Sequence, residues 1–287
     1  MKKQVVVCGA FDDMRSGGIR FLEEAAKLGE LTVLLWPDAA VHRLTGNSPK
    51  FPEAERLYFL NAVRYVSRAQ LVGADVSPDS LPENIGFCPD VWAVGDCRAN
   101  AAKEDFARTR GIEYHVLGGE RKPGFPDPTA LIESQREKKD GDAVERVPTS
   151  RRKKVVVTGC YDWFHSGHVR FFEEVSVFGD LYVVIGHDAN IRLLKGEGHP
   201  LVPQDERRYV VGSIKFVTQA LISSGEGWLD ADPEIQRLKP DIYAVNEDGD
   251  KGGKREYCAA RGLEYLVLKR TPAPGLPKRS STDLRGF

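Results

Sequence analysis

The second half of the chain alternates continuous apolar runs with stretches in which apolar residues recur at helical spacing. The continuous runs, typical of strands buried on both faces, cover residues 154–159, 181–186, 242–245 and 263–268. Helical spacing covers residues 169–178, 206–217 and 255–261. Strands that alternate with helices predict a parallel, doubly wound α/β sheet. Such sheets bind ligands at the carboxyl ends of their strands, where the strand order reverses.

The same pattern occurs twice along the chain. Residues 5–35 align without a gap with residues 155–185. Shorter matches follow in the same order: PDVWAV (89–94) with PDIYAV (240–245), GIEYHVL (111–117) with GLEYLVL (262–268), and PGFP (123–126) with PGLP (274–277). A repeat this long is a duplicated domain rather than a solenoid unit. We therefore expect tandem α/β domains at residues 1–131 and 154–287, joined by a charged, solvated linker at residues 132–153.

Composition and charge narrow the classes of partner. A hydrophobic content of 41% with 29% charged residues is ordinary for a globular protein. The net charge of −1 gives no bulk attraction to nucleic acid or to an acidic membrane surface. The N-terminal MKKQVVVCGAFDD is neither a signal peptide nor a membrane span, so a cytoplasmic protein is expected. The five cysteines lack C-x-x-C spacing, which favours mostly buried thiols in a reducing compartment over disulfides or a zinc knuckle.

The candidate chemistry lies in VTGCYDWFHSGHVR (157–170), directly after the first strand of the second domain. Gly159 allows a close backbone approach at the strand end, and His165 and His168 share one face of the helix that follows. The start of a helix is a ready site for an anion, and paired donors there suit a phosphate that gathers charge. A metal pair or a purely structural role are the alternatives, but no cluster with sensible spacing supplies a third metal ligand.

Several motifs in order carry a family resemblance. HSGH after GCYDWF resembles the H-x-G-H signature of the cytidylyltransferase-like nucleotidyltransferases. HDANIRLLKGEGHP (187–200) resembles the family segment that ends in a functional Lys-Gly, and DERRYVVGSIKFV (205–217) resembles its E-R helix. KRT (269–271) with RSSTDL (279–284) resembles the terminal R-T-x-G-x-S-T-T signature. GCYD, KRT and STDL together are most similar to the ethanolamine-phosphate cytidylyltransferases, which are themselves tandem proteins.

The resemblance implies two tandem Rossmann-like nucleotidyltransferase domains and a reaction. The phosphate of a phosphorylated alcohol attacks the α-phosphorus of a nucleoside triphosphate, and pyrophosphate leaves. By the same resemblance CMP passes from CTP to an acceptor of the phosphoethanolamine, phosphocholine or glycerol-phosphate kind. Mg²⁺ accompanies the triphosphate, and no residue is expected to hold a metal independently of the nucleotide.

The resemblance also assigns residues to roles. The implied catalytic residues are His165, His168, Lys195 and Arg270. The implied nucleotide-binding residues are Gly159, Cys160, Tyr161, Gly167, Arg207, Asn246, Asp248, Ser280, Ser281 and Thr282. Asp162 and Trp163 are the implied contacts to the acceptor.

Two other functions stay open. LLKGEGHPLVP (193–203) also resembles the adenylyltransferases that make ADP-heptose, which would transfer AMP to a sugar phosphate. Asn246 and Glu247 stand where family members carry a glycine-rich stretch, so the base is undecided. The alternative from another class is a non-catalytic nucleotide-binding scaffold. An intact H-x-G-H and the retained Lys195 argue against it, because an inert copy has no reason to keep them.

The first domain lacks the implied chemistry. Alignment places Arg15, Gly18, Thr45 and Gly119 opposite the four implied catalytic residues, and residues 129–131 opposite Ser-Ser-Thr. Asp12 and Arg56 are kept, as is the apolar framework. We therefore expect a degenerate copy retained for packing. Residues 19–28 and 169–178 are expected to pair within one chain as a pseudo-dimer, with a homodimer left open.

Overall fold

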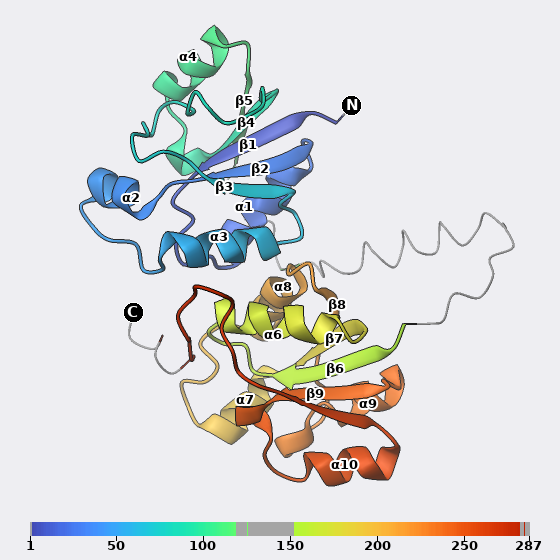
Figure 1. Ribbon diagram of the computed structural model, residues 1–287. Coiled ribbons are helices and arrows are strands. Elements are labelled where there is room, and N and C mark those ends of the chain that lie inside the picture. The colour runs from blue at the N-terminus through green and yellow to red at the C-terminus, as the bar shows by residue number, and fades with distance from the viewer. Residues whose placement is uncertain (1, 119–124, 126–151, 282–283, 285–287) are drawn as a thin grey trace, which may run out of the picture. The chain divides into compact units, whose positions relative to one another are not determined.

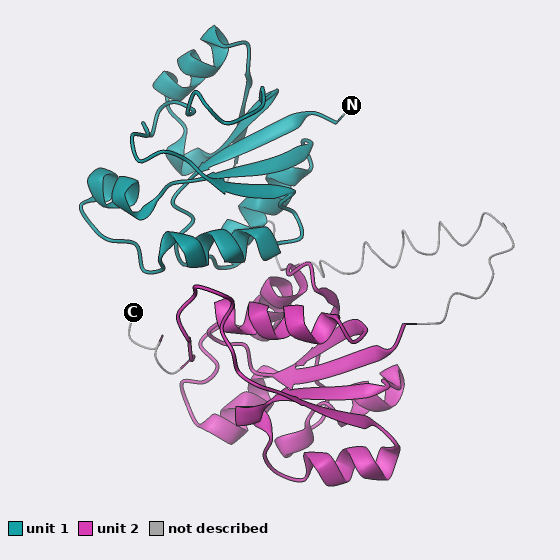
Figure 2. Ribbon diagram, viewed as in Figure 1, with its two compact units in different colours: residues 1–123 teal, residues 124–287 magenta. Residues whose placement is uncertain are grey.

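The computed structural model describes residues 2–118, 125, 152–281 and 284. The chain divides into two compact units, residues 1–123 and 124–287 (Figure 2). The domain end expected at residue 131 and nearly all of the expected linker lie outside the described residues. So do Gly119, residues 129–131 and Thr282.

Unit 1 is a five-stranded sheet with alternating helices (Figure 1). Its elements are β1 (Gln4–Gly9), α1 (Ser16–Ala26), β2 (Glu30–Leu35), α2 (Asp38–Thr45), α3 (Glu53–Ala62), β3 (Arg68–Leu71), β4 (Val91–Gly95), η1 (Asp96–Arg98), α4 (Ala101–Thr109) and β5 (Glu113–Leu117). The strands pair in parallel in the order β3-β2-β1-β4-β5.

Unit 2 repeats this arrangement. Its elements are β6 (Lys154–Gly159), α6 (Ser166–Ser176), β7 (Asp180–Ile185), α7 (Asp188–Lys195), α8 (Gln204–Gly212), β8 (Val217–Ile222), η2 (Gly227–Leu229), α9 (Asp232–Leu238), β9 (Ile242–Asn246), η3 (Glu247–Gly249), α10 (Lys254–Arg261) and β10 (Glu264–Leu268). The parallel order β10-β9-β6-β7-β8 places β6 between β7 and β9. The predicted fold class, two tandem Rossmann-like sheets, is confirmed, and the strand order reverses beside β6.

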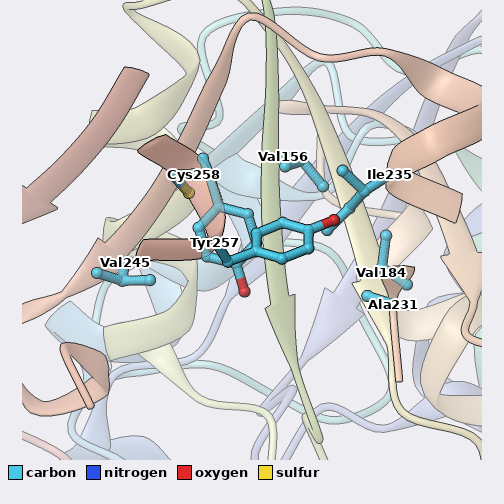
Figure 3. Packing of buried hydrophobic residues seen from close by; sticks show 8 residues of the cluster. Val156, Val184, Ala231, Ile235, Val245, Tyr257 and Cys258 are labelled. Carbon is cyan, nitrogen blue, oxygen red and sulfur yellow. The ribbon is translucent and has the colours of Figure 1, made fainter. Parts of the chain in front are cut away.

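Burial explains why the central strands read as continuous apolar runs. Val155, Val156 and Val157 of β6 are fully buried, because helices cover both faces of the sheet (Figure 1). On one face Val156 and its neighbours pack against side chains of α9 and α10, including Ile235 and Tyr257 (Figure 3). Helices α6 and α8 lie on the other face (Figure 1). Residues that follow β6 are therefore held at a rigid strand end.

The predicted helix over residues 206–217 is wrong in its second half. Helix α8 ends at Gly212, where the Ser213 hydroxyl and backbone N–H both donate to the Tyr209 carbonyl. Strand β8 begins at Val217. The apolar residues around this turn fit either period, so spacing alone could not separate helix from strand. Helices α7 and α9 were not predicted.

Two further expectations concern the surroundings of the protein. The thiols are not mostly buried, since Cys88 and Cys97 are exposed and only Cys258 of the five is buried. Among the described residues, no helix combines the length and apolar character needed to cross a bilayer.

Candidate active site

The chain turns sharply where β6 ends. Tyr161 has a φ of 54°, in the left-handed region, and its ring folds back over Gly159. A Cβ atom at position 159 would lie 2.8 Å from that ring, so a larger residue would collide with it. The close approach predicted for Gly159 is therefore an approach to Tyr161. Phe11 has the same left-handed backbone in unit 1, with a φ of 45°.

His165 and His168 are fixed by backbone N–H groups at the start of α6. The Gly167 N–H donates to Nδ1 of His165 at 3.1 Å, and the His165 N–H donates to Nδ1 of His168 at 3.4 Å. A ring nitrogen that accepts a hydrogen bond carries no proton, so in each neutral ring the proton sits on Nε2. Both histidines therefore present an Nε2–H donor.

The His168 ring lies within a stack of rings. Its centroid lies 4.0 Å from that of His165 and 5.4 Å from that of Phe164, and both contacts are stacked. Tyr161 meets it edge-on at 5.3 Å. Burial, the His165 ring and the positive charge of Arg270 hold the pKa of His168 well below its ordinary value. His168 is therefore a neutral donor at neutral pH.

Gly167 is required by the histidine beside it. A Cβ atom there would lie 2.9 Å from Cε1 of His165 and 3.0 Å from its Nδ1. Only glycine lets the imidazole ring pack flat on the first turn of α6 and accept the Gly167 N–H. The glycine of H-x-G-H thus has a steric reason in unit 2.

The C-terminal segment adds cationic groups to this site. The Arg270 guanidinium pairs with the Asp248 carboxylate and donates to the Arg279 carbonyl at 2.8 Å. The Arg279 carbonyl also lies 3.6 Å from the Cβ position of Gly167. Ser281 donates its hydroxyl to the Trp163 carbonyl at 3.4 Å. The structure therefore brings residues 270 and 279–281 to the histidines, with the half-buried Ser280 among them.

A shallow cleft opens at the start of α6, beside Gly167 of the H-x-G-H motif. It is lined by Gly167, Phe171, Asn246, Lys269, Arg270 and Arg279, among others. The Asn246 side-chain oxygen is buried, and no donor among the described residues pairs with it. A buried amide oxygen without a partner is costly, so this atom calls for a ligand that donates a hydrogen bond.

Sequence reasoning missed part of the cleft lining. Phe171 and Glu174 follow Gly167 at helical spacing on α6, Lys269 begins KRT, and Lys278 directly precedes RSSTDL. Helical spacing from Gly167 could have identified the first pair. The basic residues beside Arg270 and Arg279 could have identified the second, because cations gather where a triphosphate binds.

Lys195 stands apart from this cleft. It is the last residue of α7, is exposed to solvent and is not among the residues that line the cleft in the described part of the chain. Its implied catalytic role stays a prediction.

Arg207 and Asp162 hold the frame around the site. The Arg207 side chain is fully buried and donates to the carbonyls of Val202, Cys160 and Gly186 and to the Asp188 carboxylate, all within 2.8 Å. The Asp162 carboxylate accepts the N–H groups of Leu201 and Val202. These contacts tie the ends of β6 and β7 to the loop before α8. Any effect of Arg207 on a nucleotide would therefore act through the strand ends.

The Mg²⁺ expected with the triphosphate stays a prediction. Across the described ranges, no three His, Cys, Asp or Glu side chains converge closely enough to hold a metal ion. Where substrate phosphates and water complete its shell, Mg²⁺ takes few protein ligands.

Comparisons with known proteins agree with the geometry. A family model described as cytidylyltransferase-like matches residues 156–286. The FAD synthase of Ferroglobus placidus is 37% identical over 41% of this chain and 75% of its own length. That of Methanocella paludicola is 33% identical over 46% of this chain and 93% of its own length. The bifunctional protein HldE of Citrifermentans bemidjiense is 36% identical over 42% of this chain but only 25% of its own length. The chain therefore belongs to the cytidylyltransferase-like family of nucleotidyltransferases.

Proposed function

We propose that unit 2 transfers AMP from ATP to the phosphate of a phosphorylated small molecule. An acceptor phosphate oxygen attacks the α-phosphorus, and the bond to the β-phosphate oxygen breaks, so that pyrophosphate leaves. His165 and His168 donate through Nε2–H to phosphate oxygens on which negative charge grows, and Arg270 adds a fixed positive charge.

One observation carries this proposal: both histidines accept a backbone N–H at Nδ1. This fixes both rings as donors before a substrate arrives, so little reorganisation is needed as charge develops. Two histidines with a purely structural role would not need backbone N–H groups to fix the same tautomer in both rings. The neutral state of His168 adds a second reason, because a neutral ring keeps its orientation without an ion-pair partner.

The choice of ATP rests on the base side of the cleft and on the relatives. The unpartnered oxygen of Asn246 calls for an amino group, which adenine and cytosine both carry. FAD contains an AMP group, so the name FAD synthase favours adenylyl transfer over the CTP reading drawn from GCYD and STDL. The ADP-heptose-like resemblance of residues 193–203 points the same way.

Pyrophosphate release tests the proposal. The full chain is incubated with Mg²⁺ and either ATP or CTP over a panel of phosphorylated sugars, polyols and amines together with FMN. We expect release with ATP and at least one acceptor, and at least tenfold less with CTP. Release with CTP alone would restore cytidylyl transfer. Release with no pair would favour the non-catalytic scaffold.

A further inference from the structure

A polar relay of His187, Ser223 and Asp230 lies at the ligand edge of unit 2, outside the site described above. His187 follows β7 and precedes α7. Ser223 follows β8, and its N–H donates to the Ile185 carbonyl at 2.8 Å. The Gly186 N–H donates to the Gly159 carbonyl at 3.0 Å. His187 is the next residue along the chain and therefore lies close to the end of β6.

The hydrogen bonds of Ser223 fix the tautomer of His187. The Ser223 hydroxyl donates to the Asp230 carboxylate at 2.6 Å, which uses its single proton. Its oxygen accepts the His187 backbone N–H at 2.9 Å and lies 3.2 Å from Nδ1 of the same residue. Because the hydroxyl proton is already committed, Nδ1 must be the donor. The neutral His187 ring therefore carries a lone pair on Nε2, the reverse of His165 and His168.

Burial and close packing at the strand ends hold the relay in place. Ser223 is 4% exposed. Gly186 is required beside it, because a Cβ atom there would lie 3.2 Å from the Asp230 carboxylate and 2.6 Å from Ile191. His187 itself is partly exposed, and within the described part of the chain its Nε2 has no hydrogen-bond partner. An acceptor atom is thus held rigidly at the ligand edge.

The aligned positions of unit 1 do not form this relay. Val72 donates its N–H to the Leu35 carbonyl and so occupies the place of Ser223, and Pro37 aligns with His187. Neither residue can form the relay. Asp79, which aligns with Asp230, instead bonds Asn100 and Lys103. The relay therefore accompanies the histidine pair and is absent where the pair is absent.

We propose that His187 accepts a hydrogen bond from a hydroxyl group of the acceptor, which is a phosphorylated sugar or polyol rather than a phosphorylated amine. This rests on the proposed nucleotidyl transfer. Strand β7 lies across β6 from β9, whose end supplies Asn246 to the nucleotide cleft. None of the described residues that line this cleft comes from β7, so the second substrate is assigned to that side of β6. Arg207 already compensates the charge of Asp188, and the atom that the relay presents is a neutral lone pair, which suits a hydroxyl donor.

Calorimetric binding to the full chain, with a non-hydrolysable ATP analogue present, tests this assignment. The probes are glycerol 3-phosphate, ribose 5-phosphate and FMN, against phosphoethanolamine and phosphocholine. We expect at least one hydroxyl-bearing probe to bind about tenfold more tightly than both amines, the scale of one good hydrogen bond. His187→Ala should remove that advantage and leave binding of the ATP analogue within about twofold, well under the 1.4 kcal/mol of a tenfold change.

Two variants separate recognition from folding. Ser223→Ala removes the acceptor of the His187 Nδ1–H bond. It should weaken binding of the same probe, but by less than His187→Ala does. His115→Ala, at a partly exposed histidine of unit 1, should change neither ligand. The assignment would be overturned if an amine bound more tightly than the hydroxyl-bearing probes, or if no hydroxyl-bearing probe bound at all. It would also be overturned if His187→Ala left binding of these probes unchanged, or weakened binding of the ATP analogue alone. Pyrophosphate release with phosphoethanolamine would overturn it while sustaining nucleotidyl transfer. If a probe binds in a way that depends on His187 but no pyrophosphate is released, only the proposed nucleotidyl transfer is refuted.

Discussion

The two units keep the same frame and differ in the chemistry placed on it. In unit 1 the Asp12 carboxylate accepts the N–H groups of Lys50 and Phe51, as Asp162 does for its own loop in unit 2. Arg56 is 2% exposed and binds the Trp36 and Phe51 carbonyls and Asp38, as Arg207 does for their counterparts. Residues shared by both copies hold strand ends and loops.

The residues that differ lie at the start of the first helix. Arg15, opposite His165, pairs with Asp13 at 3.1 Å, and no side chain caps α1. Gly18 replaces His168, and the Met14 sulfur lies 3.0 Å from its Cβ position. Unit 1 has thus lost the donor pair and kept the scaffold. The comparison separates residues that fold the domain from those that we propose to act on a ligand.

Replacing His168 should produce the largest change. His168→Ala should lower turnover about 10²–10⁴-fold, because it removes a donor whose bond strengthens in the transition state. Arg15→Ala is the matched control and should leave turnover within about threefold, under the 1.4 kcal/mol of a tenfold change. Pyrophosphate release measures both. Near-normal turnover in His168→Ala would refute the mechanism.

The shared arginines should affect stability equally in the two units. Arg207→Met and Arg56→Met each leave buried carbonyls and a carboxylate without their donor, at a cost of about 3–5 kcal/mol in free energy of unfolding. Denaturant unfolding measures this in each variant. If Arg207→Met lost turnover with unchanged stability, Arg207 would act on the nucleotide directly and the scaffold reading would be wrong.

The paired glycines should respond differently. Gly167→Ala pushes a methyl group into the His165 ring and should lower turnover about tenfold, a cost of about 1.4 kcal/mol. Gly17→Ala meets nothing within 4 Å, so it should leave turnover unchanged and slightly stabilise α1. Equal effects in both variants would show that the His165 contact does not set the geometry.

The low pKa of His168 predicts a small dependence of stability on pH. Below the ordinary histidine value of 6.5 the unfolded chain takes up a proton that the folded site refuses, so stability falls as pH falls. One such proton contributes up to about 1.4 kcal/mol per pH unit. Thermal unfolding at pH 7 and pH 5.5 should show a flatter dependence in His168→Gln than in the parent. An unchanged dependence would place the proton uptake elsewhere.

The sequence sufficed for the fold wherever strands are buried on both faces. The run at residues 154–159 forms β6 with the expected bounds, because a short apolar run that ends at a glycine is typical of a strand buried on both faces. The end of α8 was missed, because the apolar residues around Ser213 fit both the helical and the strand period. Spacing located His165 and His168 but not their tautomers, which follow from backbone N–H groups that only the folded turn brings within reach.

The His187 relay shows the same limit more sharply. Its members come from the ends of β7 and β8 and from the loop before α9, far apart along the chain. No spacing rule connects residues 187, 223 and 230. Asp162 and Arg207 were identified by motif, and their contacts hold strand ends and a loop. Their implied roles toward a ligand stay predictions.

The central claim is that one of the two copies retains the reaction site, and the stoichiometry of nucleotide binding tests it most directly. Calorimetric titration of the full chain with a non-hydrolysable ATP analogue and Mg²⁺ should give one site per chain. That site should weaken in Arg270→Ala and remain in Arg15→Ala. Two equivalent sites per chain, or a single site lost in Arg15→Ala and kept in Arg270→Ala, would contradict the account.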